Sequence, residues 1–263
     1  GDGEVILDGV GLAQTDSGLM MLSAGNQVRN LKLINFLGNA VLISGTDATL
    51  NTVSGCLVGT DGNSVLPNGT GIRIEAGASA NTVGAAPEGL GNVVSGNIGS
   101  GVLITGSGTS GNLVLGNRIG TDASGIAPVP NATGIEIADG AVGTVIGGGL
   151  TGAPNIVSGN MDFGIRIHGV GTDATQIEGN TIGLDVDGAP LGNGVGILVE
   201  AGATNSVIGS LLSDGPGNTI HNNAGQGILI DGPATLGHSI RRNSISSNGL
   251  EGIALSGGAN ANL

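Results

Sequence analysis

Four ionisable residues occupy equivalent places in a recurring Gly-Ile-x-Ile pattern and are the strongest candidates for chemistry. Arg166 and His168 lie in one copy of the pattern, Glu136 lies in the copy before it and Glu200 in the copy after it. If the copies stack as strands, we expect Glu136 beside Arg166 and His168 beside Glu200. A polysaccharide lyase needs a base and a cation that neutralises the sugar carboxylate, and His168 and Arg166 could supply both. The alternative is an ordinary solvated surface, because exposed ion pairs contribute well under ~1 kcal/mol each.

A second candidate is a Gly-Thr-Asp loop at 59–61 and 120–122, with a variant at 183–188 that carries Asp185 and Asp187. Calcium takes six to eight oxygen ligands, and the variant resembles part of a calcium-binding loop. Asp185 and Asp187 are therefore weak candidates for a calcium site. We favour a different role for these aspartates, in which their side chains cap turns, because the first two loops have few other carboxylates nearby.

Several features of carbohydrate-active sites are missing from the sequence. No Asp-Asp pair supplies the acid and the water-activating carboxylate of a hydrolase, and there is no Trp or Tyr to stack on a sugar ring. His168, His221 and His238 fall at different places in the repeat, so we expect no metal triad. Apart from the weak calcium candidate, we expect no cofactor.

The elements that must position these residues are set by an internal repeat of 63 residues. The Gly-Ile-x-Ile pattern also recurs at about half that spacing, so each period contains two coils of about 31 residues. Two segments each return twice at the full spacing: 91–97 as 154–160 and 217–223, and 101–106 as 164–169 and 227–232.

Aligning the coils places apolar residues in two uninterrupted columns. The two members within a coil are separated by one residue, so they share one face of an extended strand. β-Branched residues dominate, which favours strands over helices. We expect all sixteen residues to be buried: Val41, Ile72, Val102, Ile135, Ile165, Ile197, Ile228 and Ile253 in one column, and Ile43, Ile74, Ile104, Ile137, Ile167, Val199, Ile230 and Leu255 in the other.

Asparagine forms further columns, which predict tight coil corners because Asn tolerates left-handed backbone and hydrogen-bonds nearby main chain. Cys56 aligns with the second of these columns, so we expect it to be a small buried substitute rather than a nucleophile. The first predicted column contains Asn51, Asn81, Asn112 and Asn205, with Thr144 and Thr175, and the second contains Asn97, Asn117, Asn160, Asn180 and Asn223.

The pattern predicts an all-β fold, a right-handed parallel β-helix of about eight coils forming a single domain over 1–263. Parallel strands stack ~4.8 Å apart, which gives a rod of roughly 40 Å, and parallel crossover connections are right-handed in about 98% of cases. Residues 1–38 are less regular, although 5–7 and 31–34 still resemble strands. Exposed coil ends allow self-association or contact with neighbouring domains, and we expect the chain to be a piece of a longer one.

Composition excludes several function classes. The chain has 55 glycines, only two aromatic residues and a formal net charge of −13. Such a chain repels phosphate backbones and anionic membrane surfaces, so we expect neither nucleic acid nor a membrane as partner. No stretch approaches the eighteen apolar residues of a membrane helix, so we expect no membrane insertion.

The segment Asn-x-Val-x-Gly-Asn-x-Ile-Gly-Thr-Asp-x-x-Gly at 112–125, followed by Asn-x-Thr-Gly-Ile-x-Ile at 131–137, resembles the right-handed parallel β-helix repeat proteins. These are pectate-lyase-like bacterial proteins, and the resemblance covers nearly the whole chain. It implies the β-helix fold and an extracellular or cell-surface location in a bacterium. Members of the family include polysaccharide lyases, hydrolases, epimerases and adhesins, so the resemblance does not identify an activity.

We therefore expect a structural, display or adhesive solenoid module of a secreted or cell-surface protein. The alternative is a polysaccharide lyase or epimerase that acts on acidic glycans along the outward face of the Gly-Ile-x-Ile strands, with Arg166, His168, Glu136 and Glu200 as its site. The expected partners are a polysaccharide or neighbouring domains of the same chain.

Overall fold

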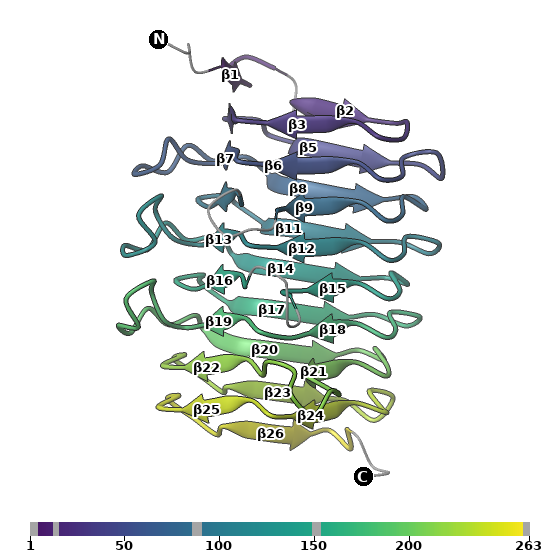
Figure 1. Ribbon diagram of the computed structural model, residues 1–263, viewed down its shortest axis with the longest axis vertical. Coiled ribbons are helices and arrows are strands. Elements are labelled where there is room, and N and C mark those ends of the chain that lie inside the picture. The colour runs from purple at the N-terminus through teal and green to yellow at the C-terminus, as the bar shows by residue number, and fades with distance from the viewer. Residues whose placement is uncertain (1–4, 13–15, 86–90, 149–153, 260–263) are drawn as a thin grey trace.

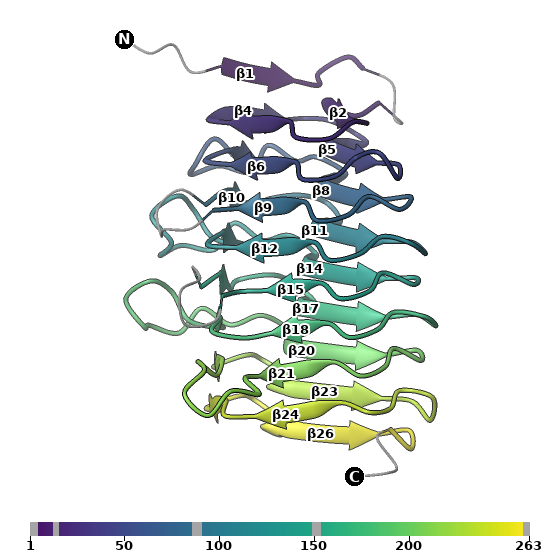
Figure 2. The same ribbon diagram turned by 45° about the vertical axis from the view of Figure 1, so that its right-hand side comes forward.

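A computed structural model describes residues 5–12, 16–85, 91–148 and 154–259. Within these residues the chain forms only strands and their connections, with no helix. Figure 1 shows the strands stacked as successive coils of one rod, and the coils wind in a right-handed sense (Figure 2). The predicted all-β parallel β-helix is confirmed.

Three parallel sheets run the length of the rod, and each coil contributes one strand to each sheet, except that the last described coil, with β25 and β26, adds none to sheet C. Sheet A contains β1 (Val5–Asp8), β4 (Leu31–Ile34), β7 (Leu57–Val58), β10 (Val93–Val94), β13 (Arg118–Ile119), β16 (Ile156–Val157), β19 (Thr181–Ile182), β22 (Thr219–His221) and β25 (Ser244–Ser246). Sheet B contains β2 (Leu19–Met21), β5 (Asn39–Ser44), β8 (Thr70–Glu75), β11 (Ser100–Thr105), β14 (Thr133–Ala138), β17 (Phe163–His168), β20 (Val195–Glu200), β23 (Ile228–Asp231) and β26 (Ile253–Ser256). Sheet C contains β3 (Gln27–Arg29), β6 (Thr52–Ser54), β9 (Thr82–Gly84), β12 (Leu113–Leu115), β15 (Val145–Ile146), β18 (Gln176–Ile177), β21 (Val207–Gly209) and β24 (Ser239–Arg241).

The two apolar columns lie on sheet B and point into the core. Strands pair in register, so that Val102 lies opposite Ile72 on one side and Ile135 on the other. Fourteen of the sixteen predicted core residues are fully buried. The prediction is wrong for Ile253 and Leu255, which are 45% and 47% exposed. They lie on β26, the last strand of sheet B, and no further described coil packs over them.

Each of the three corners of the coil carries its own ladder of buried polar side chains. In the ladders the amide oxygen of one Asn accepts hydrogen bonds from the coil before it, as Asn117 does from the backbone and side-chain nitrogens of Asn92, both at 3.0 Å. Sheet C is preceded by Asn26, Asn51, Asn81 and Asn112, followed by Thr144, Thr175, Ser206 and His238. Sheet A is preceded by Cys56, Asn92, Asn117, Asn155, Asn180, Asn218 and Asn243. Sheet B is preceded by Asn68, Asn97, Asn131, Asn160, Asn193, Asn223 and Asn248.

The predicted asparagine columns need two corrections. The second predicted column mixes alternate members of the sheet A and sheet B ladders, because Gly-Asn steps occur at both corners only a few residues apart. Asn205 is not in a ladder. It adopts a positive φ of 52°, and its neighbour Ser206 takes the buried position.

The predicted burial of Cys56 at a ladder position is confirmed. Cys56 is fully buried, and its backbone N–H donates to the Asn92 side chain at 3.0 Å. Burial raises the pKa of the Cys56 thiol, which keeps it protonated.

Long connections alternate between two corners of the rod, which explains why the sequence repeats every second coil. On alternate coils the long connection joins sheet A to sheet B, and these loops project on one side (Figure 1). On the coils between them the long connection joins sheet C to sheet A instead. The sheet A to sheet B loops are 59–69, 120–132 and 183–194, and the longer sheet C to sheet A connections lead from β9 to β10, from β15 to β16 and from β21 to β22.

A second alternation occurs in the turn between sheets B and C. The Thr109 hydroxyl donates to the Thr105 carbonyl and accepts the N–H of Gly77 from the preceding coil, at 2.9 and 3.1 Å. Thr172 and Thr235 make the same bonds two and four coils further on. Alanine fills the equivalent buried position in the intervening coils, at Ala78, Ala141 and Ala203, and also in the coil before Ala78, at Ala48, so the alternation begins at Ala78.

Candidate functional site

The predicted ionisable residues come together on the outer surface of sheet B, on the neighbouring strands β14, β17 and β20. The backbone register is the expected one, with Glu136 opposite Arg166 and His168 opposite Glu200. The side chains, however, cross over diagonally. The His168 Nε2 atom lies 2.7 Å from Glu136 Oε1, and the Arg166 Nε atom lies 2.8 Å from Glu200 Oε1.

Glu136 is at the centre of this cluster. Its carboxylate contacts His168, accepts a hydrogen bond from the Ser100 hydroxyl, and lies 3.6 Å from Arg166 Nη1. The hydrogen bond with His168 lowers the pKa of Glu136. Partial burial acts in the opposite direction, and the contacts with Ser100 and Arg166 lower it further. Glu136 is therefore a stable carboxylate at neutral pH rather than a proton donor.

The Arg166 guanidinium contacts two carboxylates and an aromatic ring. It is paired with Glu200 through Nε and Nη2, and its charge lies 5.5 Å from the centre of the Phe163 ring. Phe163 begins the same strand, β17. This combination of a carboxylate and an aromatic face holds a guanidinium in one orientation.

The arrangement of Ser100, Glu136 and His168 differs from that of a catalytic nucleophile and its general base. In a Ser-His-carboxylate triad the imidazole lies between the hydroxyl and the carboxylate. In this cluster the Glu136 carboxylate lies between Ser100 and His168, so the Ser100 hydroxyl donates to a carboxylate and is not activated by an imidazole. The arrangement forms an ionic cluster across three coils. For His168 to accept a proton through Nε2, its contact with Glu136 has to be broken.

Ser100 and Phe163 belong to the cluster but were missed from the sequence. Both are the first residues of their sheet B strands, and Ser100 pairs with Thr133, which pairs with Phe163. The signal was available, because each of these residues immediately precedes the glycine of the Gly-Ile-x-Ile pattern.

The Gly-Thr-Asp loops use their aspartates as turn caps, as the sequence suggested. Asp185 is buried, and its Oδ1 accepts the backbone N–H groups of Asp187 at 2.9 Å and Ala189 at 2.7 Å. Asp61 likewise accepts the N–H groups of Asn63 and Ser64 at 3.0 and 2.8 Å.

The same hydrogen bonds explain the acidity of two of these aspartates. Hydrogen bonds from the Ser64 and Asn63 N–H groups lower the pKa of Asp61. Partial burial raises the pKa of Asp122, but hydrogen bonds from the Ser124 hydroxyl and from backbone N–H groups outweigh burial, so that this pKa is lowered as well. Across residues 5–12, 16–85, 91–148 and 154–259, no group of three or more His, Cys, Asp or Glu side chains is placed to hold a metal ion.

The other two histidines lie on different faces, as expected from their places in the repeat. His221 is on β22 in sheet A, and its Nε2 lies 3.0 Å from the Ser244 hydroxyl. His238 is buried at the end of the sheet C ladder, where its Nδ1 accepts the N–H of Ser206 at 3.2 Å. Burial lowers the pKa of His238.

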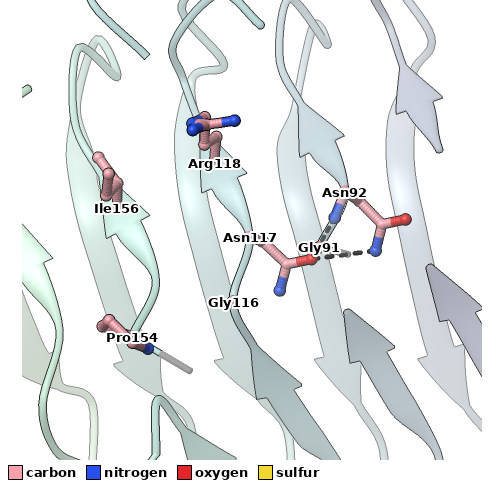
Figure 3. Close-up of a pocket in the computed structure, with 7 residues that line it drawn as sticks. All are labelled: Gly91, Asn92, Gly116, Asn117, Arg118, Pro154 and Ile156. Atoms are coloured by element: carbon pink, nitrogen blue, oxygen red, sulfur yellow. Dashed lines mark hydrogen bonds between the residues drawn. The ribbon is translucent and has the colours of Figure 1, made fainter. Parts of the chain in front are cut away.

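A small cavity beside sheet A lies away from the ionic cluster. Figure 3 shows it next to the sheet A ladder, where Asn92 donates to Asn117, with Arg118, Pro154 and Ile156 on neighbouring coils. Its volume is about 40 Å³, which is room for a water molecule and not for a substrate.

No helix among the described residues is long and apolar enough to cross a membrane. When the chain is compared with known proteins, no protein-family model, no curated protein and no solved structure matches it.

Proposed function

We propose that the chain is a structural module, a rod-shaped solenoid segment that spaces, displays or adheres within a larger secreted or cell-surface bacterial protein. The observation that carries this proposal is that the ionisable side chains of sheet B are bound by one another. His168 is held by Glu136, and Arg166 is held by Glu200 and Glu136. Groups that are mutually neutralised stabilise a surface and are poorly prepared to bind a charged substrate.

The continuity of the rod supports the same proposal. Successive coils are joined by parallel strand pairs and by asparagine ladders before sheets A and B, while the ladder before sheet C is hydrogen-bonded through Asn26, Asn51, Asn81 and Asn112 and is interrupted at Thr144 and Thr175. Because these bonds run along the rod axis, bending the rod would distort many of them at once. A stiff element of this kind suits a spacer that holds other domains apart.

The alternative function is a polysaccharide lyase or epimerase, and one observation favours it. Arg166 and His168 project from the same face of β17, and two carboxylates flank them from the adjacent strands. A uronate carboxylate has the same chemistry as Glu200 and could replace it on Arg166. His168 would then serve as the base, but only after release from Glu136, which makes this the weaker of the two functions.

Turnover on acidic glycans separates the two functions. The wild-type chain, His168→Ala and the control His221→Ala are incubated with a panel of uronate polysaccharides, and the unsaturated product is measured by its absorbance. Epimerisation is followed on the same samples by NMR of the uronate residues. The structural module predicts no turnover by any of the three proteins. Turnover that is lost in His168→Ala and kept in His221→Ala would contradict the structural-module proposal and support the lyase or epimerase function.

The shape of the rod provides an independent test. Small-angle X-ray scattering should give the profile of one stiff elongated particle, unchanged between low and high salt. A profile that becomes compact or flexible as salt rises would contradict the role of a spacer.

A further inference from the structure

The ladder before sheet C changes its chemistry halfway along the rod. Up to Asn112 the acceptor in each step is an asparagine carboxamide, as in the step from Asn51 to Asn81. Asn81 Oδ1 accepts the backbone N–H of Asn51 at 2.9 Å, and Asn81 Nδ2 donates to the Ala48 carbonyl at 2.9 Å. One side chain therefore supplies both an acceptor and a donor to the coil before it. The next three ladder positions are occupied by Thr144, Thr175 and Ser206.

These three steps each leave the same polar groups without a partner. The hydroxyls of Thr144, Thr175 and Ser206 are buried and make no hydrogen bond within the described part of the chain. The backbone N–H groups one coil earlier, at Asn112, Thr144 and Thr175, are buried as well and donate to no described residue. Such groups are rare in folded proteins, because each has given up its hydrogen bonds to solvent.

A carbonyl with spare capacity completes each set. In the asparagine part of the ladder the Ala78 carbonyl accepts two hydrogen bonds, from the Ser110 N–H at 3.4 Å and from Asn112 Nδ2 at 3.1 Å. One step further on, the Thr109 carbonyl accepts the Val142 N–H at 3.0 Å and, among the described residues, nothing else. The equivalent carbonyls of the next two steps, which also accept a single N–H group, are those of Ala141 and Thr172.

One water molecule matches each set of groups. It accepts the N–H and donates to the carbonyl, which are the two functions of the carboxamide, and it keeps a third bond for the hydroxyl. A threonine or serine side chain ends one bond earlier than asparagine, so the outer atoms of the carboxamide leave their place to the water. Two groups bridged by a water at ~2.8–2.9 Å on each side lie roughly 4.6 Å apart, which is close to the ~4.8 Å between coils.

We propose that three water molecules are bound in a row at the corner before sheet C, each in the place of one asparagine carboxamide. His238 ends the row, because its Nδ1 accepts the Ser206 N–H directly at 3.2 Å. The first water bridges Asn112, Thr109 and Thr144, the second bridges Thr144, Ala141 and Thr175, and the third bridges Thr175, Thr172 and Ser206.

Nuclear Overhauser effects between water and amide protons test this proposal in solution. The amide protons of Asn112, Thr144 and Thr175 should each show a cross-peak to a long-lived water, because each donates to one. The amide protons of Asn51 and Asn81 are internal controls. Each of them donates directly to the carboxamide of the next coil, so neither should show such a cross-peak.

Three variants should move or keep the waters in a defined way. Thr144→Asn supplies the carboxamide of the first step, so the Asn112 cross-peak should be lost while that of Thr175 remains. Thr144→Val removes the hydroxyl and keeps the short side chain, so the Asn112 cross-peak should persist. This variant separates a bound water from exchange through the hydroxyl proton. Asn81→Thr creates a further step of the same kind and should give the Asn51 amide a cross-peak.

A high-resolution crystal structure of the wild-type chain locates the same waters. Each should lie about 2.7–3.2 Å from one of the three amide nitrogens and from the carbonyl oxygen of its set. The proposal is overturned if the wild-type amides of Asn112, Thr144 and Thr175 show no cross-peak, or if Asn51 and Asn81 show equal ones. Loss of the Asn112 cross-peak in Thr144→Val, or hydroxyls bonded directly to the amide nitrogens in the crystal, would overturn it equally.

Discussion

The His168 imidazole bonds to Glu136 on the preceding coil, at 2.7 Å, although the backbone of His168 lies opposite Glu200 on the following coil. The side chains reach diagonally because Arg166, two residues earlier on the same strand, takes Glu200 for itself. One strand thereby ties together the coil above it and the coil below it. The cluster therefore links three successive coils, and its contribution to the free energy of unfolding depends on the charge of Glu136.

We expect the ionic cluster to make stability depend on pH at the acid end. The pKa of Glu136 is lowered in the folded chain from its ordinary value of 4.5, so the unfolded state binds a proton more readily. The stabilisation is therefore complete above pH ~4.5 and is lost as pH falls through the lower, folded value. Urea unfolding between pH 7 and pH 3 should show a shallower acid decline in Glu136→Gln than in the wild type. The control Asp47→Asn, at an exposed turn, should follow the wild type, and equal slopes for all three would contradict this account.

Truncation of the core should be costly. Ile167 is fully buried among its neighbours in the column, so Ile167→Ala should lower the free energy of unfolding by roughly 2–5 kcal/mol. Leu103 is on the outer face of the same sheet and only partly buried, so Leu103→Ala should cost far less. Denaturant titration measures both values. Equal losses would mean that the two faces of sheet B are assigned incorrectly.

Breaking a ladder should also be costly. Asn117→Ala removes the oxygen that accepts both the backbone N–H and the side-chain amide of Asn92; the backbone N–H is left buried without a partner, and the amide keeps only its bond to the Val53 carbonyl. Each such group costs about 1–3 kcal/mol, so the loss in unfolding free energy should exceed that of an ordinary polar substitution. Asn63→Ala, in an exposed loop, is the matched control. If the two variants lose the same stability, the ladders contribute little.

The two-coil alternation predicts which deletions the rod tolerates. Removing residues 101–163 takes out 63 residues and joins Ser100 to Gly164, so Gly77 still meets a threonine, Thr172, in the next turn. Removing 101–133 takes out one coil and places Ala141 there, which leaves the Gly77 N–H without its hydroxyl acceptor. Thermal unfolding followed by circular dichroism should show a larger loss for the shorter deletion. A shorter deletion that proves the more stable would show that the alternation has no energetic consequence.

The sequence predicted the fold well because the same apolar pair recurs in every coil and nothing else satisfies that spacing. It predicted less about the corners, where Gly-Asn steps at two places five residues apart, such as Asn92 and Asn97, look alike without knowledge of the strands between them. The strand register expected from the repeat correctly predicted that four residues lie on neighbouring strands: Glu136, Arg166, His168 and Glu200. Their actual partners could not be predicted, because a long side chain can reach several neighbouring residues. Arg166, for example, forms its hydrogen bond with Glu200 and so leaves His168 to bond with Glu136.

Threonine and alanine alternate in the turn between sheets B and C from Ala78 to Thr235, whereas the two turns nearest the start of the rod, at Ala48 and Ala78, both carry a buried alanine. Within the alternating part, loss of a single coil would place two like turns side by side, whereas loss of a pair of coils keeps their order. A change in length that preserves this order therefore adds or removes about 10 Å, the height of two coils.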